Sequence, residues 1–377
     1  MSRRPSRAPI AELPSPLGLT AAGFVERAGP LGYSAELAAE LYRRFFRENV
    51  WPDEAGEIGL VPRVGRVLSE DHELGAVRKF LLPVPGVAAA HRGFTEGTTL
   101  DTESVVIPMK NRRGVTHTLC VSSQVGCAMG CAFCETAQMG LVRSLSVAEI
   151  VQQWHAATHQ LGARIDNIVF MGMGEPLDNV DAVIGAIEVL TDHLGPAVPM
   201  KRITVSTVGR LDGLERLARQ VKLPGWRKLN LAVSVNAPND EIRSSIMPIN
   251  RAMPLEKLVA FLKAWPSRSS DLMCVEYVLI PGVNDADEHA DELAALLREV
   301  RCCINVIPYN PRTDSPWPAP EEADVVRFLR RLEGAGAFCK RRKTKGRQKM
   351  AACGQLGNAE IRGRRFVGLA VEGAAVG

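Results

Sequence analysis

Three cysteines lie close together in the chain, with the spacing Cys-x3-Cys-x2-Cys from Cys127 through Cys131 to Cys134. Thiolates at such spacings bind iron–sulfur clusters or zinc, and most of these sites take four ligands from the protein. Here the local run supplies three, so a four-iron cluster would keep one iron open for a substrate. A zinc site completed by Cys120 or His117 is the alternative, and the spacing favours the cluster.

A glycine-rich segment, Gly172 to Pro176, follows the apolar run 167–171. Gly172 and Gly174 allow the backbone to come close to a ligand, and Glu175 offers a carboxylate to its amino or hydroxyl groups. An open iron can chelate the amino and carboxylate groups of S-adenosylmethionine (SAM), and one electron then cleaves a carbon–sulfur bond to give a deoxyadenosyl radical. The two loops together indicate this radical chemistry.

Short apolar runs alternate with amphipathic segments from about residue 100 onward. The expected strands are 104–109, 118–122, 167–171, 202–207, 229–235, 273–279 and 303–308, and the expected helices are 146–159, 180–191, 213–220, 255–264, 285–298 and 321–333. This alternation predicts an α/β fold on a parallel sheet, closed partly into a (β/α)6 barrel related to the TIM barrel. Because the loops after barrel strands carry the chemistry, we expect the cysteine loop and the glycine-rich loop to share one mouth.

The chain divides into four segments. We expect a disordered basic tail at 1–19, a small helical domain at 20–95, the barrel core at 96–365 and a second tail at 366–377. No run of about 18 apolar residues occurs, so neither a membrane span nor a membrane partner is expected. The nine cysteines are irregularly spaced, unlike a secreted disulfide framework, so we expect reduced thiols and a cytoplasmic protein.

A basic run covers residues 340–349, with seven Lys or Arg in ten residues and no acid. A solvated strand end is the usual account of such a run. A surface that neutralises phosphates is the functional alternative. The position of the run just before Cys353 favours the second interpretation.

Longer motifs around these loops carry a resemblance to a known family. They are Leu-Cys-Val-Ser-Ser-Gln-Val-Gly-Cys at 119–127, Thr-Ala-Gln at 136–138, Gly-Met-Gly-Glu-Pro at 172–176 and Ala-Ala-Cys-Gly-Gln-Leu at 351–356. Over about residues 100–360 the chain resembles the radical SAM adenosine methyltransferases of the RlmN/Cfr class. The resemblance implies a radical SAM barrel, an RNA-docking role for the helical domain, one 4Fe-4S cluster on the three loop cysteines, and two SAM molecules per turnover.

The resemblance also assigns roles to individual residues. Cys353 matches the cysteine that is methylated, Cys120 its partner thiol, and Glu103 the carboxylate described as the proton acceptor. The SAM contacts carry over to Gly174, Glu175, Ser206, Ser234, Val235, Asn236 and Asn310. The implied reaction methylates an adenosine ring carbon in rRNA or tRNA, carbon 2 being the family default and carbon 8 the alternative. The implied partners are RNA and an electron-donor protein such as flavodoxin or ferredoxin.

Elementary chemistry makes these roles intelligible. Carbon 2 of adenine is electron-poor and has no lone pair to attack a sulfonium methyl, so a radical route is needed. A Cys353 thiolate can accept a methyl group from one SAM, and the radical from a second SAM can remove hydrogen from that methyl so that it adds to the ring. Attack of Cys120 on the Cys353 sulfur would then release the RNA and leave a disulfide that cellular reductants reopen.

The chain departs from the family at two places. Asn236 stands where the family has histidine, and residues 347–350 stand where acidic residues are common. Both changes lie where RNA would bind, and they leave the radical machinery intact. Two alternatives stay open: a radical SAM enzyme with a non-RNA substrate, which would not need the methyl-carrying role of Cys353, and a zinc-bound RNA-binding module.

Overall fold

The computed structural model describes residues 13–52, 61–86, 98–111, 114–266, 272–312, 314–342, 345–346 and 350–357. The tail expected at 366–377 lies outside these residues, as does most of the tail expected at 1–19. Residues 13–19 differ from that expectation, because Leu13 and Leu17 are buried and a short 3-10 helix, Pro16–Gly18, packs beside a barrel helix. Two apolar side chains thus hold this end of the predicted tail on the fold.

Parallel strands form the larger part of a ten-stranded sheet, and the sequence predicted such a parallel arrangement. They run in the order β4 (Gly114–Cys120), β7 (Asn167–Phe170), β8 (Ile203–Thr207), β9 (Asn230–Ser234), β10 (Met273–Leu279), β11 (Cys302–Pro308) and β12 (Cys339–Arg341). The first six correspond to the predicted strands from 118–122 to 303–308. The predicted partial barrel is confirmed, and β12 extends it by one strand.

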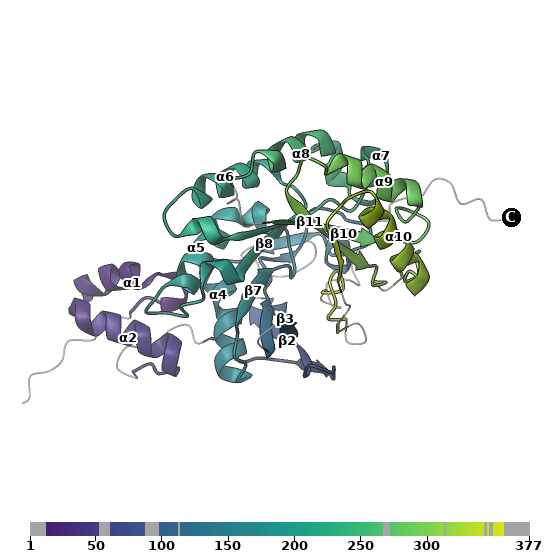
Figure 1. Ribbon diagram of the computed structural model, residues 1–377. Helices are drawn as coiled ribbons and strands as arrows, with labels where there is room; N and C mark the ends of the chain where they lie inside the picture. The colour runs from purple at the N-terminus through teal and green to yellow at the C-terminus, as the bar shows by residue number, and fades with distance from the viewer. Residues whose placement is uncertain are drawn as a thin grey trace, which may run out of the picture.

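Helices cover the outer side of this sheet (Figure 1). They are α4 (Val147–His155), α5 (Val180–Thr191), α6 (Leu211–Val221), α7 (Asp240–Ile246), α8 (Leu255–Lys263), α9 (Asp287–Leu296) and α10 (Glu322–Gly334). A capping box begins α4, with the Ser146 hydroxyl accepting from the Glu149 N–H and the Glu149 carboxylate accepting from the Ser146 N–H. None of the helices in the described ranges is long and apolar enough to cross a membrane.

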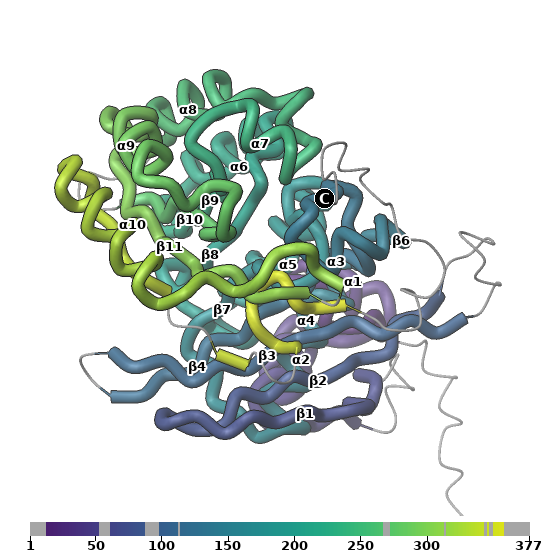
Figure 2. The backbone as a smooth tube through the Cα atoms, turned by 90° about the vertical axis from the view of Figure 1, so that its right-hand side faces the viewer, coloured from purple at the N-terminus to yellow at the C-terminus, as the bar shows by residue number. Residues whose placement is uncertain are grey.

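An antiparallel extension precedes the parallel strands, visible at the lower edge of Figure 2. It consists of β1 (Val67–Glu70), β2 (Val77–Val84) and β3 (Leu100–Asn111), and β3 joins β4 antiparallel. The predicted strand 104–109 is therefore antiparallel rather than parallel, because β3 pairs with the next strand of the chain up to Asn111 opposite Gly114. The expectation of a helical region over 20–95 is wrong for 67–84, where alternating burial on β2 builds a strand of the main sheet.

Two helices of the N-terminal region are as expected, α1 (Ala21–Ala28) and α2 (Ala35–Glu48). They lie outside the barrel helices α4 and α5 (Figure 1). The Phe45 ring stacks on His155 of α4 at 4.7 Å, and the Phe46 carbonyl lies 2.9 Å from His159 Nε2. The Ala21 N–H donates to Asp192 over 2.7 Å. The helical pair is therefore packed against the barrel by aromatic and polar contacts.

Candidate active site

The cysteine loop begins after β5 (Gln124–Gly126), which pairs with β6 (Leu141–Ser144), and it ends at the short helix α3 (Glu135–Gln138). Backbone bonds fix its path, since the Cys127 N–H donates to the Gly140 carbonyl and the Ala132 N–H to the Ile246 carbonyl. The guanidinium of Arg312 donates to the Ala132 carbonyl over 2.8 Å. The loop is thus held from both sides of the barrel mouth.

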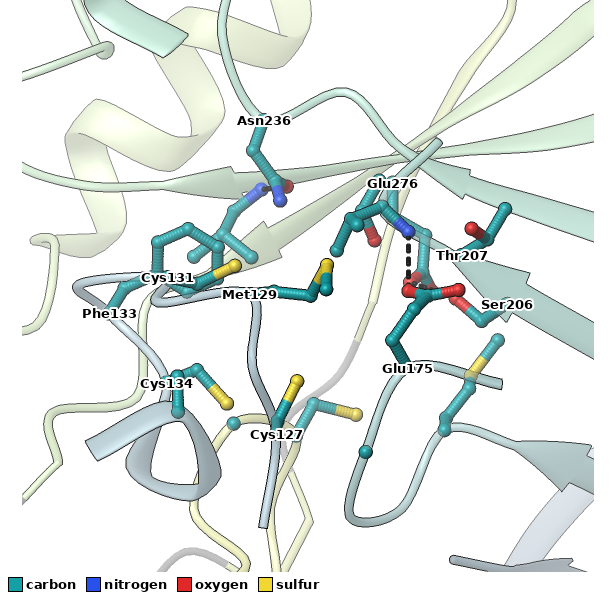
Figure 3. A pocket seen from close by; sticks show the side chains of 18 of the residues that line it. Cys127, Met129, Cys131, Phe133, Cys134, Glu175, Ser206, Thr207, Asn236 and Glu276 are labelled. Carbon is teal, nitrogen blue, oxygen red and sulfur yellow. Dashed lines mark hydrogen bonds between the residues drawn. The ribbon is translucent and has the colours of Figure 1, made fainter. Parts of the chain in front are cut away.

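Cys127, Cys131 and Cys134 line one cavity, and their sulfur atoms turn toward a common space (Figure 3). Burial raises the pKa of each thiol, so a bound cation would be needed to keep them as thiolates. Within the described ranges no three His, Cys, Asp or Glu side chains are placed to hold a single metal ion. Three thiols around an open cavity fit a 4Fe-4S cluster with one iron free for a ligand.

The glycine-rich loop lies opposite the cysteines, as expected. Gly174 has a φ of +100°, and a Cβ there would meet the Gln124 side chain at 2.5 Å, so only glycine fits. Glu175 accepts from the N–H groups of Val208 and Leu177 at 2.9 and 3.0 Å. Burial nevertheless raises the pKa of Glu175 to about 7, so its carboxyl group can respond to a cationic ligand.

Most of the predicted SAM contacts line this same cavity, whose empty volume is about 900 Å³ including its open mouth. They are Gly174, Glu175, Ser206, Ser234, Asn236 and Asn310. Val235 is buried beside the cavity and does not line it. The Oδ1 atom of buried Asn310 has no hydrogen-bond partner among the described residues, so it is available to a polar ligand such as SAM.

Asn236, which replaces the family's histidine, is an integral part of the cavity wall. It takes a left-handed conformation, with φ +57°, that asparagine tolerates better than most residues. Its Oδ1 accepts from the Val278 N–H at 2.9 Å, and its Nδ2 lies 3.4 Å from the Met247 sulfur. The substitution therefore keeps a polar side chain at this point with its own hydrogen bond.

The two predicted catalytic cysteines approach each other from distant parts of the chain. Cys353 lines the cavity, and Cys120 is buried at the last residue of β4. Burial and then the neighbouring Cys353 raise the pKa of Cys120 to about 12. Burial raises the pKa of Cys353 as well, but the cation of Arg342 opposes that shift.

Glu103, the third predicted catalytic residue, lies on β3 beside the cavity rather than in its lining. It is buried and forms an ion pair with Lys79 of β2, with Nζ at 3.2 Å from Oε1. It also accepts from the Gly357 N–H at 2.9 Å. Burial raises the pKa of Glu103, and the Lys79 cation opposes that shift. The roles inferred for Glu103, Cys120 and Cys353 remain predictions.

Sequence reasoning missed Glu276, Arg342 and Lys79. Arg342 donates to Glu276, which lines the cavity, and no local motif marks either residue. The signal for Arg342 was the basic run, which was interpreted as facing phosphates. The described cations of that run make protein contacts, Arg341 with Glu322 and Lys345 with the Pro108 carbonyl among them. Lys343, Arg347 and Lys349 lie outside the described residues.

The chain is similar in sequence to radical SAM proteins. Residues 121–294 match the model of the Radical SAM superfamily. The chain is 45% identical over 267 residues to "Probable dual-specificity RNA methyltransferase RlmN 1" of Protochlamydia amoebophila, covering 71% of this chain and 72% of that protein. It is 41% identical over 311 residues to the dual-specificity RNA methyltransferase RlmN of Alkalilimnicola ehrlichii, covering 80% and 79%.

A solved structure of a radical SAM methyltransferase has a similar fold. The crystal structure of a radical SAM methyltransferase from Sphaerobacter thermophilus superposes with a TM-score of 0.77 at 34% identity, covering 90% of this chain and 98% of that one. The predicted barrel, the enzyme class and the use of SAM with a 4Fe-4S cluster are confirmed. The chain belongs to the RlmN family of radical SAM RNA methyltransferases.

Proposed function

We propose that this protein methylates carbon 2 of an adenosine in rRNA or tRNA, through a methyl group carried on Cys353. The observation that carries the proposal is the position of Cys353, which lines the same cavity as the three cysteines of the cluster loop. The relatives are named dual-specificity RNA methyltransferases, which supports RNA as the substrate. Carbon 8 is the alternative position on the ring.

The cofactors would be held by residues already placed around the cavity. Cys127, Cys131 and Cys134 would bind the 4Fe-4S cluster, while Glu175 and Asn310 would contact SAM. When bound, the cluster and SAM supply the methyl group and the radical that activates it. The protein's own part is to orient SAM, to exclude water and to present the Cys353 sulfur to both SAM and RNA.

Each catalytic residue then has one task. The Cys353 thiolate accepts a methyl group, and the nearby guanidinium of Arg342 favours that thiolate over the thiol. After the methylene group has bridged the Cys353 sulfur and the adenine ring, the adduct has to lose one electron, for which the oxidised cluster would be the acceptor, and Glu103 takes the ring proton. The Cys120 thiolate attacks the Cys353 sulfur, the carbon–sulfur bond breaks with its electron pair left on the methylene carbon, and that carbon takes up a proton to become the methyl group of the base. The Cys120–Cys353 disulfide is reopened by a cellular dithiol.

Two partners complete the proposal. An electron-donor protein such as flavodoxin or ferredoxin reduces the cluster. The helices α1 and α2 dock the RNA, since they form a separate layer outside the barrel (Figure 1). The zinc-bound RNA-binding alternative predicts zinc without iron or sulfide after anaerobic reconstitution, whereas the radical SAM proposal predicts iron and sulfide.

The decisive experiment maps methylated adenosines in cellular RNA with and without the gene, and then repeats the mapping with Cys120→Ala. We expect one or a few sites of 2-methyladenosine that vanish without the gene. Cys120→Ala should accumulate a covalent protein–RNA adduct, because nothing then attacks the Cys353 sulfur. Cys339→Ala, a buried cysteine on β12, is the matched control and should turn over normally. Unchanged RNA, or normal turnover by Cys120→Ala, would refute the proposal.

A further inference from the structure

The segment that carries Cys353 is attached to the buried ion pair of Lys79 and Glu103. Lys79 Nζ lies 3.2 and 3.3 Å from the two carboxylate oxygens of Glu103, and it donates to the Met350 carbonyl at 3.1 Å. The Gly357 N–H donates to Glu103 Oε2 at 2.9 Å. One ion pair therefore holds both ends of residues 350–357, the segment that Figure 2 shows in yellow beside β3.

The middle of the same segment is attached to the cluster side of the cavity. The Gly354 carbonyl accepts from the Glu135 N–H at 2.7 Å, and the Leu356 carbonyl accepts from the Thr136 hydroxyl. Gln355 donates to the Pro311 carbonyl at 3.1 Å. Residues 350–357 thus span the gap between the cluster helix α3 and the strands β2 and β3, with Cys353 between the two sets of contacts.

Both carboxylate oxygens of Glu103 already accept hydrogen bonds from the protein. Both oxygens contact Lys79, and Oε2 accepts from Gly357 in addition. The side chains of Lys79 and Glu103 are only 6% and 5% exposed, so water cannot replace a lost partner cheaply. While the segment is docked in this way, the carboxylate already has donors and is a poor acceptor for a further proton.

We propose that Lys79 and Glu103 form a clamp that holds the Cys353 segment against the cavity, and that release of Gly357 from the clamp frees Glu103 to accept the adenosine proton. Lys79 is a positioning residue, because it acts by holding Glu103 and the Met350 carbonyl. The second half of this inference rests on the proposed function. The clamp links the position of Cys353 to the ability of Glu103 to take up a proton. Glu103 can accept the adenosine proton only after residues 350–357, and Cys353 with them, have moved away.

Amide hydrogen exchange and alkylation of Cys353 test the clamp in the anaerobic holoenzyme. Lys79→Met and Glu103→Leu should each raise exchange at residues 350–357 by roughly tenfold, the size expected for losing one hydrogen bond to a charged group. Iodoacetamide should label Cys353 faster to a similar degree. Glu103→Gln keeps an amide oxygen for the Gly357 N–H and should retain slow exchange there. Arg78→Met, the neighbouring cation on β2 that donates to the Leu161 carbonyl, is the control and should change neither rate.

A variant that leaves one buried charge unpaired can unfold the protein, so the double variant Lys79→Met/Glu103→Leu is included. It removes both charges while keeping apolar volume, which preserves folding in comparable buried pairs. We expect a folded protein with a loose Cys353 segment. Wild-type exchange and alkylation rates in that folded variant would overturn the clamp.

RNA methylation by the wild-type protein separates this inference from the proposed function. If the wild type fails to methylate RNA while the clamp variants loosen residues 350–357, the proposed function fails and the clamp stands. If the wild type methylates RNA and the variants leave the segment unchanged, the clamp fails and the function stands. The coupling to the base has its own readout: a folded, cluster-loaded Lys79→Met enzyme should release the methylated RNA from the protein–RNA adduct faster than the wild type, and an equal rate of release would refute the coupling.

Discussion

Arg342 donates a hydrogen bond to Glu276 over 3.0 Å, although the two residues are 66 positions apart in the chain. Glu276 is 9% exposed and lines the cavity, and Arg342 is 27% exposed at the end of β12. The largest electrostatic influence on Arg342 is Cys353, which raises the pKa of the guanidinium. The ion pair therefore holds a fixed positive charge beside the sulfur that we propose as methyl carrier.

Replacing Arg342 should make the Cys353 thiol less reactive. Because only the thiolate is nucleophilic, losing the cation should slow iodoacetamide labelling of Cys353 by about tenfold, the effect of one pKa unit. Mass spectrometry of the Cys353 peptide from Arg342→Met measures this rate. Arg341→Met removes the adjacent cation, which pairs with Glu322 at the surface, and should leave the rate unchanged. Equal slowing in both variants would contradict a specific role for Arg342.

The pair also shows what could be predicted from the sequence and what could not. The cysteine loop was predictable because its three candidate ligands lie within one short segment, so their spacing favours a cluster over a zinc site. Arg342 and Glu276 meet only because β12 pairs with β11 and β11 pairs with β10 in a particular register. No local pattern encodes that register. The basic run therefore suggested a phosphate surface, whereas Arg342 turns toward the cavity.

Some strands of the sheet could be predicted from the sequence and others could not. The parallel strands were predictable because runs such as 273–279 are mainly apolar and are followed by amphipathic helices. The antiparallel extension was not, because β2 carries Arg78 and Lys79 side by side, and charged residues argue against a buried strand. Lys79 can be buried in this strand because it forms an ion pair with Glu103 of β3. Lys79 lies opposite Val105, and Glu103 is two residues away from Val105 on the same strand. Only the folded sheet shows the two charges together.

The pH dependence of stability should report the buried carboxyl of Glu175. Burial raises its pKa from an ordinary value of 4.5 to about 7 in the folded protein, so between these pH values the native state keeps a proton that the unfolded state has released. The free energy of unfolding should therefore fall as pH rises from about 4.5 through 7, by up to about 3 kcal/mol from this group. Denaturant unfolding at several pH values should show a shallower fall for Glu175→Gln. Glu215→Gln, an exposed residue of α6, should keep the wild-type slope, and a wild-type slope in Glu175→Gln would contradict the assignment.

Removing one cluster cysteine should abolish iron binding. Cys131→Ser replaces a thiolate by a weak ligand, so iron after anaerobic reconstitution should drop from about four per chain to nearly none. Iron and sulfide analysis with absorbance spectroscopy measures the loss. Cys303→Ser, on β11 outside the cavity lining, is the control and should bind iron like the wild type. Full iron content in Cys131→Ser would exclude that residue as a ligand.

Docking of the N-terminal helices should depend on Phe45. Its ring is 7% exposed and stacks on His155, so Phe45→Ala removes buried area and leaves a cavity between α2 and α4. Such truncations cost about 3 kcal/mol or more of folding free energy.

In Phe45→Ala, residues 21–48 should exchange amide hydrogen much faster while the barrel strands stay protected. RNA affinity should fall while SAM binding stays unchanged. Leu37→Ala on the same helix is the control, because Leu37 is 49% exposed and should shift stability by less than about 0.5 kcal/mol. Loss of protection throughout the barrel in Phe45→Ala would instead show that these helices are part of one cooperative core.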